Sequence, residues 1–273
     1  MSQAAGPVHT AAKVLTSRQV GSFRHVTLAV DGLTAWRPGQ FVALSPLEAH
    51  LARRCFWIHQ VRPAGGYAVT VEIVVEPVGE SSRKVASLLP GDEVACTAPL
   101  GRPFLLPRDP DTCLLVGEGH HAAPLVALAG RLRERGCAVT MLVAAPDEAH
   151  LLSALEARRS ARSVTVVTED GSVGLRGTVA EHLPALVERV QPAVVYASAP
   201  DQTLHAVAQL AEDHGVWSQT AREAPLTCAT GLCQGCPVPV VGEDGVRRVA
   251  RACVDGPVFR GDRVRWVDLA GWR

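Results

Sequence analysis

The chain has 273 residues, of which 47% are hydrophobic, and its 27 basic residues balance its 27 acidic residues. This length fits two or three compact units, and the apolar content excludes a disordered chain. No basic stretch indicates a nucleic-acid surface, and no apolar run approaches the ~18 residues that a membrane helix needs. The first residues lack the pattern of a secretory signal, so we expect a soluble, cytoplasmic protein that binds neither membrane nor nucleic acid.

The first 108 residues have the pattern of β structure. Apolar and polar residues alternate in the run YAVTVEIVVEPV at 67–78, which is typical of a half-buried strand. Similar short runs, separated by glycine and proline, lie at 23–30, 41–46 and 92–99. One helix is predicted in this part, at 81–89. Short strands at this spacing favour an antiparallel sandwich or barrel.

From residue 109 the pattern changes to strands that alternate with helices. Each of the predicted buried strands is followed by an amphipathic helix, and these strands lie at 112–118, 138–145, 163–169 and 193–200. Such alternation indicates a parallel sheet with helices on its faces. Beyond about residue 222 the periodicity fades, and cysteine and glycine dominate. We therefore predict three domains, at 1–108, 109–221 and 222–273.

The chain has eight cysteines, and in a reducing compartment they do not form a disulfide framework. Four are scattered: Cys55, Cys96, Cys113 and Cys137. Cys96, Cys113 and Cys137 lie in apolar runs, where free cysteine is expected to behave as a small buried hydrophobic residue. The other four all fall near the end of the chain. Clustering of this kind indicates a metal site.

The clustered cysteines have the spacing C-x4-C-x2-C, and a fourth follows after sixteen intervening residues: Cys228, Cys233, Cys236 and Cys253. This is the ligand spacing of plant-type [2Fe–2S] proteins, whereas structural zinc sites more usually contain two C-x2-C pairs. Gly231 and Gly235 let the loop fold closely around three thiolates. We predict a [2Fe–2S] cluster, with zinc or inert thiols as the alternatives. Because such a cluster moves single electrons, it needs a flavin or another two-electron carrier beside it.

These segments together resemble the electron transfer subunits of the heteromeric dihydroorotate dehydrogenases over nearly the whole chain. The closest part is the cysteine loop followed by RACVDGPVFRGDRV, and PGQFV at 38–42, LARRCFWI at 51–58 and PLGRPF at 99–104 are also similar. The resemblance implies an N-terminal FAD-binding antiparallel β-barrel of the ferredoxin-reductase type. It also implies a central parallel-sheet nucleotide-binding domain and a small C-terminal [2Fe–2S] module.

The resemblance further implies a flavin site. Arg54 matches the arginine of an Arg-x-x-Ser/Thr motif, where a fixed cation offsets the charge of the FAD pyrophosphate; the alternative is a surface charge beside Arg53. Gly79, Ser81 and Ser82 match a Gly-x-Gly-Thr turn that binds the pyrophosphate, with Ser81 replacing its second glycine and Ser82 its threonine. The other flavin-binding residues implied by position are Cys55, Phe56, Trp57, Val74, Val75 and Glu76. Trp57 stands where a small hydroxyl residue is usual, and it either stacks on the flavin or fills a core.

The expected NAD(H) site departs from the family pattern after the first strand of the central domain. Where the family has roughly Gly-Gly-Gly-x-Gly, this chain reads Gly117-Glu118-Gly119-His120-His121. Gly117 and Gly119 remain candidates for NAD(H) binding, but the Glu118 carboxylate works against a phosphate and His121 adds bulk. The two histidines are either solvated residues at a helix start or contacts for a different partner.

A second departure lies at the end of the strand at 193–200. The family usually has Cys-Gly-Pro close to the nicotinamide, whereas this chain reads Ser198-Ala199-Pro200. Ser198 keeps a small polar group there and is a further candidate for NAD(H) binding. Glu223 matches an acidic residue just before the cluster loop, and Ala229 replaces a glycine of that loop.

The leading hypothesis is an oxidoreductase subunit that passes electrons between NAD(H), FAD and the cluster. Its implied partner is an FMN-containing dihydroorotate-dehydrogenase-like catalytic subunit, in a heterotetramer that would serve pyrimidine biosynthesis. One alternative is an FAD/[2Fe–2S] relay that has lost direct NAD(H) binding, and another is a stand-alone NAD(P)H-dependent reductase. A non-redox scaffold would require that the cluster is absent.

Overall fold

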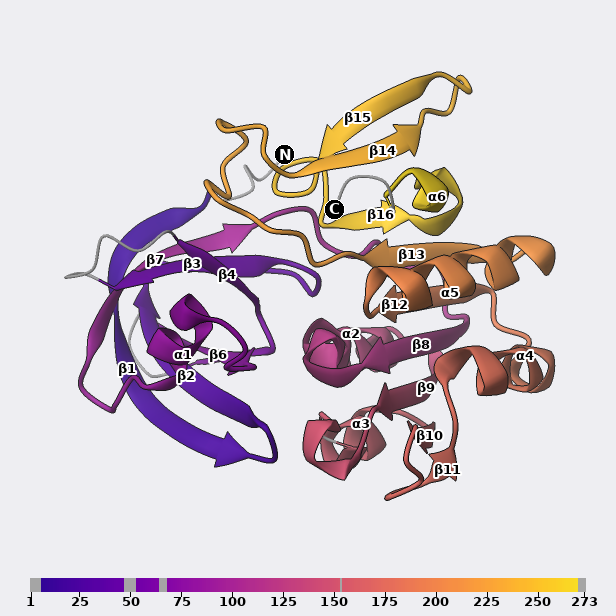
Figure 1. Cartoon of the computed structure of the whole chain (residues 1–273), viewed down its shortest axis with the longest axis horizontal. Helices are drawn as coiled ribbons and strands as arrows, with labels where there is room; N and C mark the ends of the chain where they lie inside the picture. The colour runs from indigo at the N-terminus through magenta and orange to yellow at the C-terminus, as the bar shows by residue number, and fades with distance from the viewer. Residues whose placement is uncertain (1–5, 47–52, 64–67, 153, 270–273) are drawn as a thin grey trace.

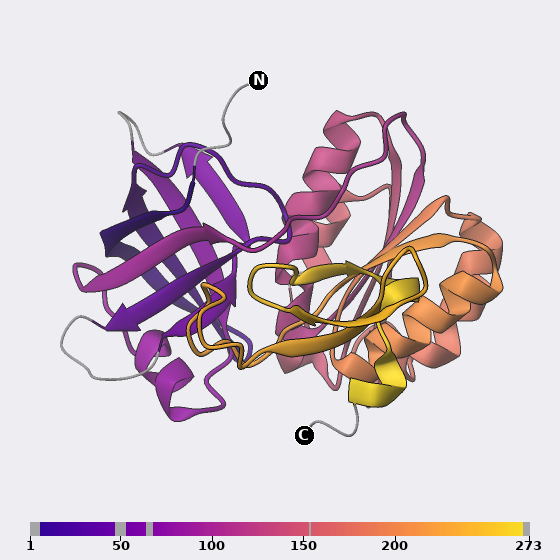
Figure 2. The same ribbon diagram turned by 90° about the horizontal axis from the view of Figure 1, so that it is seen from above.

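The computed structural model describes residues 6–46, 53–63, 68–152 and 154–269. They form a β-barrel, a parallel sheet flanked by helices and a smaller C-terminal module (Figure 1). The barrel and the parallel sheet lie side by side, and the C-terminal module lies over the junction between them (Figure 2). The predicted fold class is therefore confirmed.

The barrel is one antiparallel sheet of seven strands in the order β4-β3-β7-β1-β2-β6-β5. Along β2, side chains alternate between the interior and the outside, so that Val26, Leu28 and Val30 fill the barrel. A short helix, α1 (Glu80–Ala86), follows β6; it begins one residue before the helix predicted at 81–89 and ends three residues earlier. The strands are β1 (Val8–Val20), β2 (Phe23–Asp31), β3 (Phe41–Pro46), β4 (Arg54–Trp57), β5 (Gln60–Pro63), β6 (Ala68–Val75) and β7 (Glu93–Leu100).

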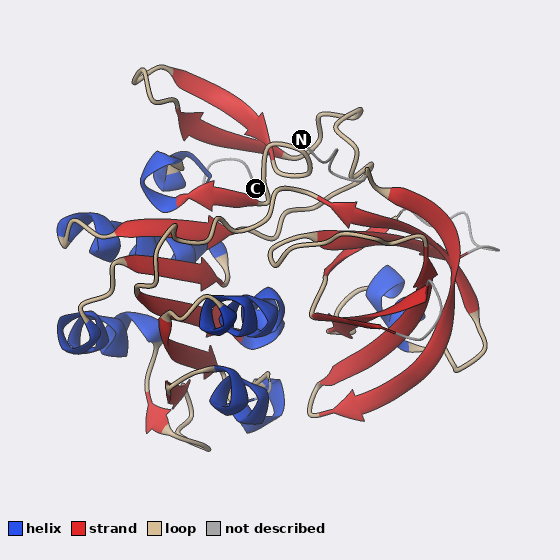
Figure 3. Cartoon of the chain, turned by 180° about the vertical axis from the view of Figure 1, so that it is seen from behind, coloured by secondary structure: helices blue, strands red, loops and turns tan. Residues whose placement is uncertain are grey.

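The central sheet has the strand order β11-β10-β9-β8-β12-β13-β16. All its neighbouring strands pair in parallel except β13 and β16. Its strands are β8 (Thr112–Glu118), β9 (Ala138–Ala145), β10 (Ser163–Thr168), β11 (Leu175–Arg176), β12 (Val194–Ser198), β13 (Trp217–Ala221) and β16 (Val258–Arg260). Helices cover both faces (Figure 3): α2 (Ala123–Glu134), α3 (Ala154–Ser160), α4 (Val179–Val190) and α5 (Asp201–Asp213).

Two elements of this sheet differ from the sequence-based expectation. The apolar pattern after the strand at 138–145 predicts one helix, at 147–160. In the structure this segment begins with a separate 3-10 turn, η2 (Glu148–His150), because the Asp147 carboxylate accepts the backbone N–H of His150 and closes the turn. β13 was not predicted, since its sequence WSQTA contains no apolar run. Its polar residues Ser218, Gln219 and Thr220 are nevertheless buried, because the strand is enclosed between β12 and β16.

The C-terminal module consists of the hairpin β14 (Pro237–Val241) and β15 (Arg247–Arg251), the strand β16 and the short helix α6 (Trp266–Leu269). β16 pairs antiparallel with β13, from Gln219 opposite Arg260 to Ala221 opposite Val258. The backbone of the last fifty residues therefore completes the edge of the central sheet. The three predicted domain ranges stay a prediction.

One continuous apolar core joins the three parts. It contains the strands of the central sheet together with Phe41 and Trp57 from the barrel and Cys236 and Cys253 from the C-terminal module. The scattered cysteines Cys96, Cys113 and Cys137 are buried, and no disulfide joins any cysteine of the chain. Within the part of the chain that the structure describes, no helix is both long and apolar enough to cross a membrane.

Candidate functional site

A cavity of about 460 Å³ opens where the barrel, the turn after β8 and the segment before the cysteine loop meet. Its volume lies within the range of pockets that bind small molecules and cofactors. One wall consists of residues for which the sequence predicts flavin contact: Arg54, Cys55, Phe56, Trp57, Val74, Glu76, Gly79, Ser81 and Ser82. The lining also includes His120, His121 and the segment from Glu223 to Leu226.

Neighbouring residues of β6 point to opposite sides of the barrel wall. Val74 lines the cavity, whereas Val75 is completely buried among the side chains that fill the barrel. The alternation follows from the two-residue period of a strand. Val75 is therefore the one predicted flavin residue whose side chain the structure does not bring to the cavity.

Two features of the barrel wall suit a bound polar cofactor. Trp57 lines the cavity, and its indole Nε1 is buried without a hydrogen-bond partner among the described residues. A buried donor in that condition costs free energy that an acceptor on a bound molecule would recover. Arg54 is exposed at the same wall and offers a permanent cation to an anionic group.

The turn before α1 holds Gly79 and Ser82 close together. The backbone N–H of Gly79 donates to the Ser82 Oγ over 3.0 Å, and that hydroxyl lies 3.1 Å from the Gly79 carbonyl oxygen, to which it donates. These bonds fix the shape of the turn at the cavity wall. Ser81 also lines the cavity and makes no side-chain bond within this turn.

Two histidines and two glutamates form a connected group on the rim of the cavity. His120 and His121 lie on the 3-10 turn η1 (Gly119–Ala122), which joins β8 to α2. His120 Nδ1 is 2.7 Å from the Glu76 carboxylate, and His120 Nε2 is 3.3 Å from Glu223 Oε2. His121 Nδ1 is 3.1 Å from the same Glu223 oxygen, but it is not aligned for a hydrogen bond.

The charges of this group are strongly coupled. Burial alone would lower the pKa of His120, but its hydrogen bonds to Glu223 and Glu76 raise that pKa to about 9. Burial alone would raise the pKa of Glu223, but the imidazoles of His120 and His121 hold it far below its usual range. Without further ligands, His120 is therefore a cation between two carboxylates at neutral pH.

The four predicted cluster cysteines lie together in one region. Cys236 Sγ and Cys253 Sγ are 3.4 Å apart, and both residues are buried. Cys228 Sγ accepts the backbone N–H groups of Thr230 and Cys233, at 3.5 and 3.4 Å. The Cys233 Sγ accepts the backbone N–H of Gly235 at 3.4 Å. Backbone N–H groups directed at sulfur stabilise thiolates, which is the form that binds iron.

The thiols differ in how readily they lose a proton. The Cys233 backbone N–H lowers the pKa of Cys228 to about 6, so this residue is a thiolate at neutral pH. Burial, together with the neighbouring Cys236, raises the pKa of Cys253 to about 12. Cys253 would thus lose its proton only to a metal, as metal-bound thiols do. The four residues fit a cationic iron–sulfur group.

Cys55 connects the cavity to the cysteine region. It lies on β4 in the cavity wall, and burial raises its pKa to about 12, with further contributions from Cys253, Glu223 and Cys228. Leu226 also lines the cavity and stands two residues before Cys228. The cavity and the cysteine loop are therefore neighbours, which is the arrangement that electron transfer between two bound groups requires.

The three residues predicted to bind NAD(H) lie at the carboxyl edge of the central sheet. Gly117 and Ser198 are opposite each other on β8 and β12, the point at which the strand order reverses and where such sheets bind ligands. A Cβ on Gly117 would lie 2.6 Å from the Ala122 Cβ, so the close packing of η1 requires glycine there. Gly119 has a positive φ of 54°, and the Ser198 hydroxyl is buried without a partner among the described residues.

A second, smaller cavity of about 210 Å³ lies at this edge, between β9, α4 and α5. Glu118 and Glu169 line it, and Glu118 accepts a hydrogen bond of 2.6 Å from Thr203. The Glu118 side chain is thereby drawn toward α5. Among the residues that the structure describes, no lysine or arginine lines this cavity.

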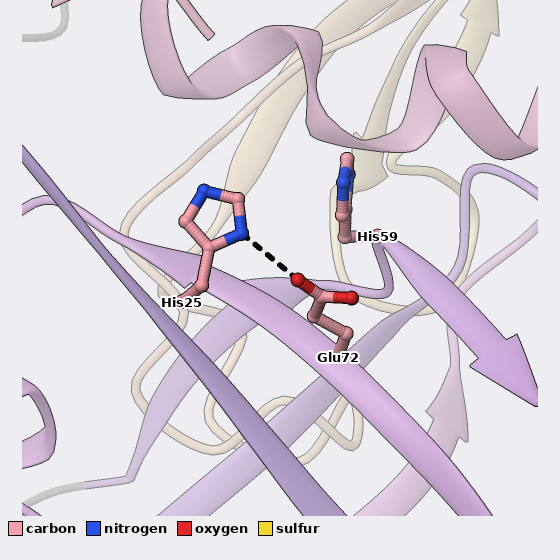
Figure 4. A group of neighbouring side chains, drawn as sticks. All are labelled: His25, His59 and Glu72. Atoms are coloured by element: carbon pink, nitrogen blue, oxygen red, sulfur yellow. Dashed lines mark hydrogen bonds and ion pairs between the residues drawn. The ribbon is translucent and has the colours of Figure 1, made fainter. Parts of the chain in front are cut away.

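A buried polar group lies between the barrel and the helices α2 and α3. Figure 4 shows His25 and Glu72 joined by a hydrogen bond of 2.9 Å, with His59 beside them. His59 is fully buried, its Nδ1 is 2.9 Å from the Ala123 carbonyl oxygen, and its Nε2 is 2.8 Å from the Glu156 carboxylate. Because a carbonyl and a carboxylate oxygen both accept hydrogen bonds, this arrangement calls for a donor on each ring nitrogen, which is what an imidazolium provides. Burial alone would lower the pKa of His59, but Glu156 raises it.

Sequence reasoning left part of this site unassigned. The sequence assigns no definite role to His120 and His121, and it gives no motif for the segment from Ala224 to Leu226. The one signal in the sequence is proximity to the cysteine loop. Glu223 stands five residues before Cys228, so its segment is expected to lie near the group that exchanges electrons with the cluster. Nothing in the local sequence shows that residues 76, 120 and 223 meet.

Comparison with known proteins points to one family. The model described as the iron-sulfur cluster binding domain of dihydroorotate dehydrogenase B matches residues 223–265. The electron transfer subunit of dihydroorotate dehydrogenase B (NAD(+)) from Desulforamulus reducens is 32% identical over 232 residues, covering 84% of this chain and 87% of that protein. The subunit of the same name from Listeria monocytogenes serovar 1/2a is 28% identical over 267 residues, covering 94% and 99% of the two chains.

A solved structure shares the whole architecture. The structure of an NADH-dependent reduced ferredoxin-NADP oxidoreductase, described for flavin-based electron bifurcation, matches with a TM-score of 0.83 at 25% identity. The match covers 99% of this chain and 94% of that one. The likeness therefore extends through the barrel, the central sheet and the C-terminal module.

Proposed function

This chain belongs to the family of dihydroorotate dehydrogenase B electron transfer subunits, and on that premise we propose that it passes electrons between NAD(H), FAD and a [2Fe–2S] cluster to or from a catalytic partner subunit. The observation that carries the proposal is the adjacency of the cavity and the cysteine loop, because Cys55 and the segment that leads into Cys228 both line the cavity. When bound, FAD would supply the exchange of two electrons with NAD(H), and the cluster would supply single-electron transfer.

The barrel wall would bind FAD. Arg54 would pair with the pyrophosphate, and the turn at Gly79–Ser82 would bring backbone N–H groups to it. Trp57 has a buried N–H free to donate to a ring heteroatom, and Phe56 and Val74 supply apolar surface. The predicted contact of Val75 could then involve only its backbone.

The cysteine loop would hold the cluster. Cys228, Cys233, Cys236 and Cys253 would be the iron ligands, with Cys236 and Cys253 on the buried side and Cys233 exposed. Backbone N–H groups of the loop donate to two of the sulfurs before any metal is present. This preorganisation stabilises the negative charge of the thiolates that would hold the cationic iron–sulfur core.

The exposed side of the loop suits a protein partner. Leu232 stands between two of the ligands and is 85% exposed, and the neighbouring Cys233 is also exposed. A large apolar side chain beside an exposed ligand is best explained by a partner that covers both. The names of the relatives imply a catalytic subunit, and we propose that it carries FMN and that two copies of each subunit form a heterotetramer.

The small cavity at the edge of the central sheet favours NAD(H) over NADP(H). Glu118 and Glu169 line it without a compensating arginine or lysine. A carboxylate can accept a ribose hydroxyl but repels a 2′-phosphate, whereas NADP sites usually contain an arginine. Ser198 and Gly117 would lie on the nicotinamide side of this edge.

The test is the visible spectrum of anaerobically purified protein before and after addition of NADH or NADPH. We expect flavin and iron–sulfur bands that NADH bleaches and NADPH bleaches far more slowly. Bands that only dithionite bleaches would contradict the role of NAD(H) and leave a relay between proteins. A colourless protein from a careful anaerobic preparation would contradict the whole proposal.

A further inference from the structure

We propose that His120, His121 and Glu223 form a binding site for one zinc-like divalent cation at the rim of the cavity, oriented by Glu76. This site goes beyond the electron-transfer function and does not depend on it. Its donors are two imidazoles and a carboxylate, none of which is a predicted ligand of the iron–sulfur cluster. They come from η1 and from the segment that precedes the cysteine loop.

The spacing of the donor atoms matches one small cation. One ring nitrogen of each histidine and a Glu223 oxygen all lie within 4.8 Å of one another. Glu223 Oε2 is 3.3 Å from His120 Nε2 and 3.1 Å from His121 Nδ1. Tetrahedral zinc with bonds of about 2.0–2.2 Å has neighbouring ligand atoms about 3.4 Å apart. The two separations from the Glu223 oxygen therefore need only a small expansion.

Glu76 occupies the place of an outer carboxylate. A histidine that binds a metal almost always donates its other ring N–H to a carboxylate or a carbonyl, which fixes its tautomer. His120 Nδ1 is 2.7 Å from Glu76 Oε2 on the side away from Glu223. With its proton on Nδ1, His120 presents the lone pair of Nε2 toward Glu223 and His121.

His121 distinguishes this site from a simple network of ion pairs. His120 has a carboxylate oxygen near each ring nitrogen, at 2.7 and 3.3 Å, whereas the buried His121 Nδ1 has only Glu223 Oε2 beside it, at 3.1 Å and without hydrogen-bond alignment. A cation held between Nδ1 and Glu223 would use that lone pair. The side chains of His120 and His121 are 22% and 18% exposed, and that of Glu223 is 42% exposed, so the fourth position is open to water.

The donor set selects the metal. Two imidazoles, one carboxylate and no sulfur suit zinc and the neighbouring divalent transition metals better than calcium or magnesium, which prefer oxygen. Three protein ligands with an open fourth position are the usual composition of a reactive zinc site. Because Glu76 follows β6, a bound cation would also tie the barrel to the two later parts of the chain.

The experiment loads the full chain, with FAD and the cluster in place, with Zn²⁺ and records X-ray absorption at the zinc edge. Iron does not contribute there, so the two metal sites are read separately. We expect one zinc per chain, with a nitrogen and oxygen shell at about 2.0–2.1 Å and no sulfur shell at about 2.3 Å. His121→Ala and Glu223→Gln should abolish binding, and Glu76→Gln should weaken it about 10–100-fold in competition with a chelator.

His214→Ala is the matched control, because His214 is an exposed histidine at the end of α5 and should leave zinc binding unchanged. A sulfur shell would mean that zinc had entered the cysteine loop and would overturn the proposal. Failure of the native chain to bind zinc would also overturn it, leaving the four residues as an ion-pair network. Zinc binding and the type of ligand shell are both measured independently of whether NADH bleaches the flavin.

Discussion

Replacement of His59 by asparagine tests how the barrel is joined to the central domain. The asparagine amide can still donate to the Ala123 carbonyl oxygen from the place of Nδ1, but it cannot reach Glu156. The variant therefore removes one hydrogen bond of 2.8 Å between a buried cation and a carboxylate. Loss of such a bond costs about 1.5–3 kcal/mol, and because the Glu156 side chain is 28% exposed we expect about 1.5–2 kcal/mol.

This loss should depend on pH in a definite direction. The pKa of His59 is raised in the folded chain, so its contribution to stability is complete below about pH 6.5 and falls as the pH rises through the folded value. The groups that face His59 are Glu156 on α3, Glu72 on β6, His25 on β2 and the Ala123 carbonyl. Above its pKa, wild-type His59 keeps only one of its two ring bonds and should behave like the asparagine variant.

The assay is thermal unfolding of both proteins at about pH 6 and about pH 9. At the lower pH the variant should unfold roughly 3–8 °C below the wild type, and at the higher pH the difference should shrink. His214→Asn, at an exposed end of α5, serves as the control and should shift the midpoint little. An equal difference at both pH values would refute the imidazolium, and no difference at either would refute the role of His59 in the junction.

Three further changes probe the cysteine loop. Cys236→Ser should abolish the iron–sulfur bands while the flavin bands remain, as read from the visible spectrum; retained bands would exclude Cys236 as a ligand. Gly231→Ala should destabilise the loop by about 1–2 kcal/mol and speed iron release, because Gly231 has a φ of +83° and the new Cβ would lie 3.2 Å from Val254. An unchanged rate of iron release would contradict this role of Gly231. Leu232→Asp should weaken the complex with the partner subunit at least about tenfold, as measured by sedimentation, because it places a charge in an apolar contact. The visible spectrum should not change. An unchanged affinity would show that Leu232 is not part of the docking surface.

The parts of the structure that could be predicted depend on short-range patterns. The strands and helices of the central sheet follow from runs of apolar residues, and the cysteine loop follows from the spacing of Cys228, Cys233 and Cys236. The flavin wall was inferred by position on β4, β6 and the turn before α1, and most of its residues do line one cavity. Whether they bind FAD stays a prediction.

The parts that could not be predicted depend on tertiary contacts. Glu76, His120 and Glu223 are far apart in the sequence and meet only because the barrel, η1 and the segment after β13 converge. β13 reads as a polar segment, yet Ser218, Gln219 and Thr220 are buried by neighbouring strands. The sequence pattern of β13 alone cannot indicate this burial, because the strands that cover β13 come from other parts of the chain.

The pairing of β16 with β13 limits how this protein can be divided. A chain cut before the cysteine loop would lose β16 and expose the unpaired backbone groups of β13 along the edge of the central sheet. Such an edge readily recruits strands from other molecules, so the shortened flavoprotein would be prone to self-association. The iron–sulfur segment therefore cannot be removed or exchanged as an independent domain, because its strand β16 covers the edge of the central sheet.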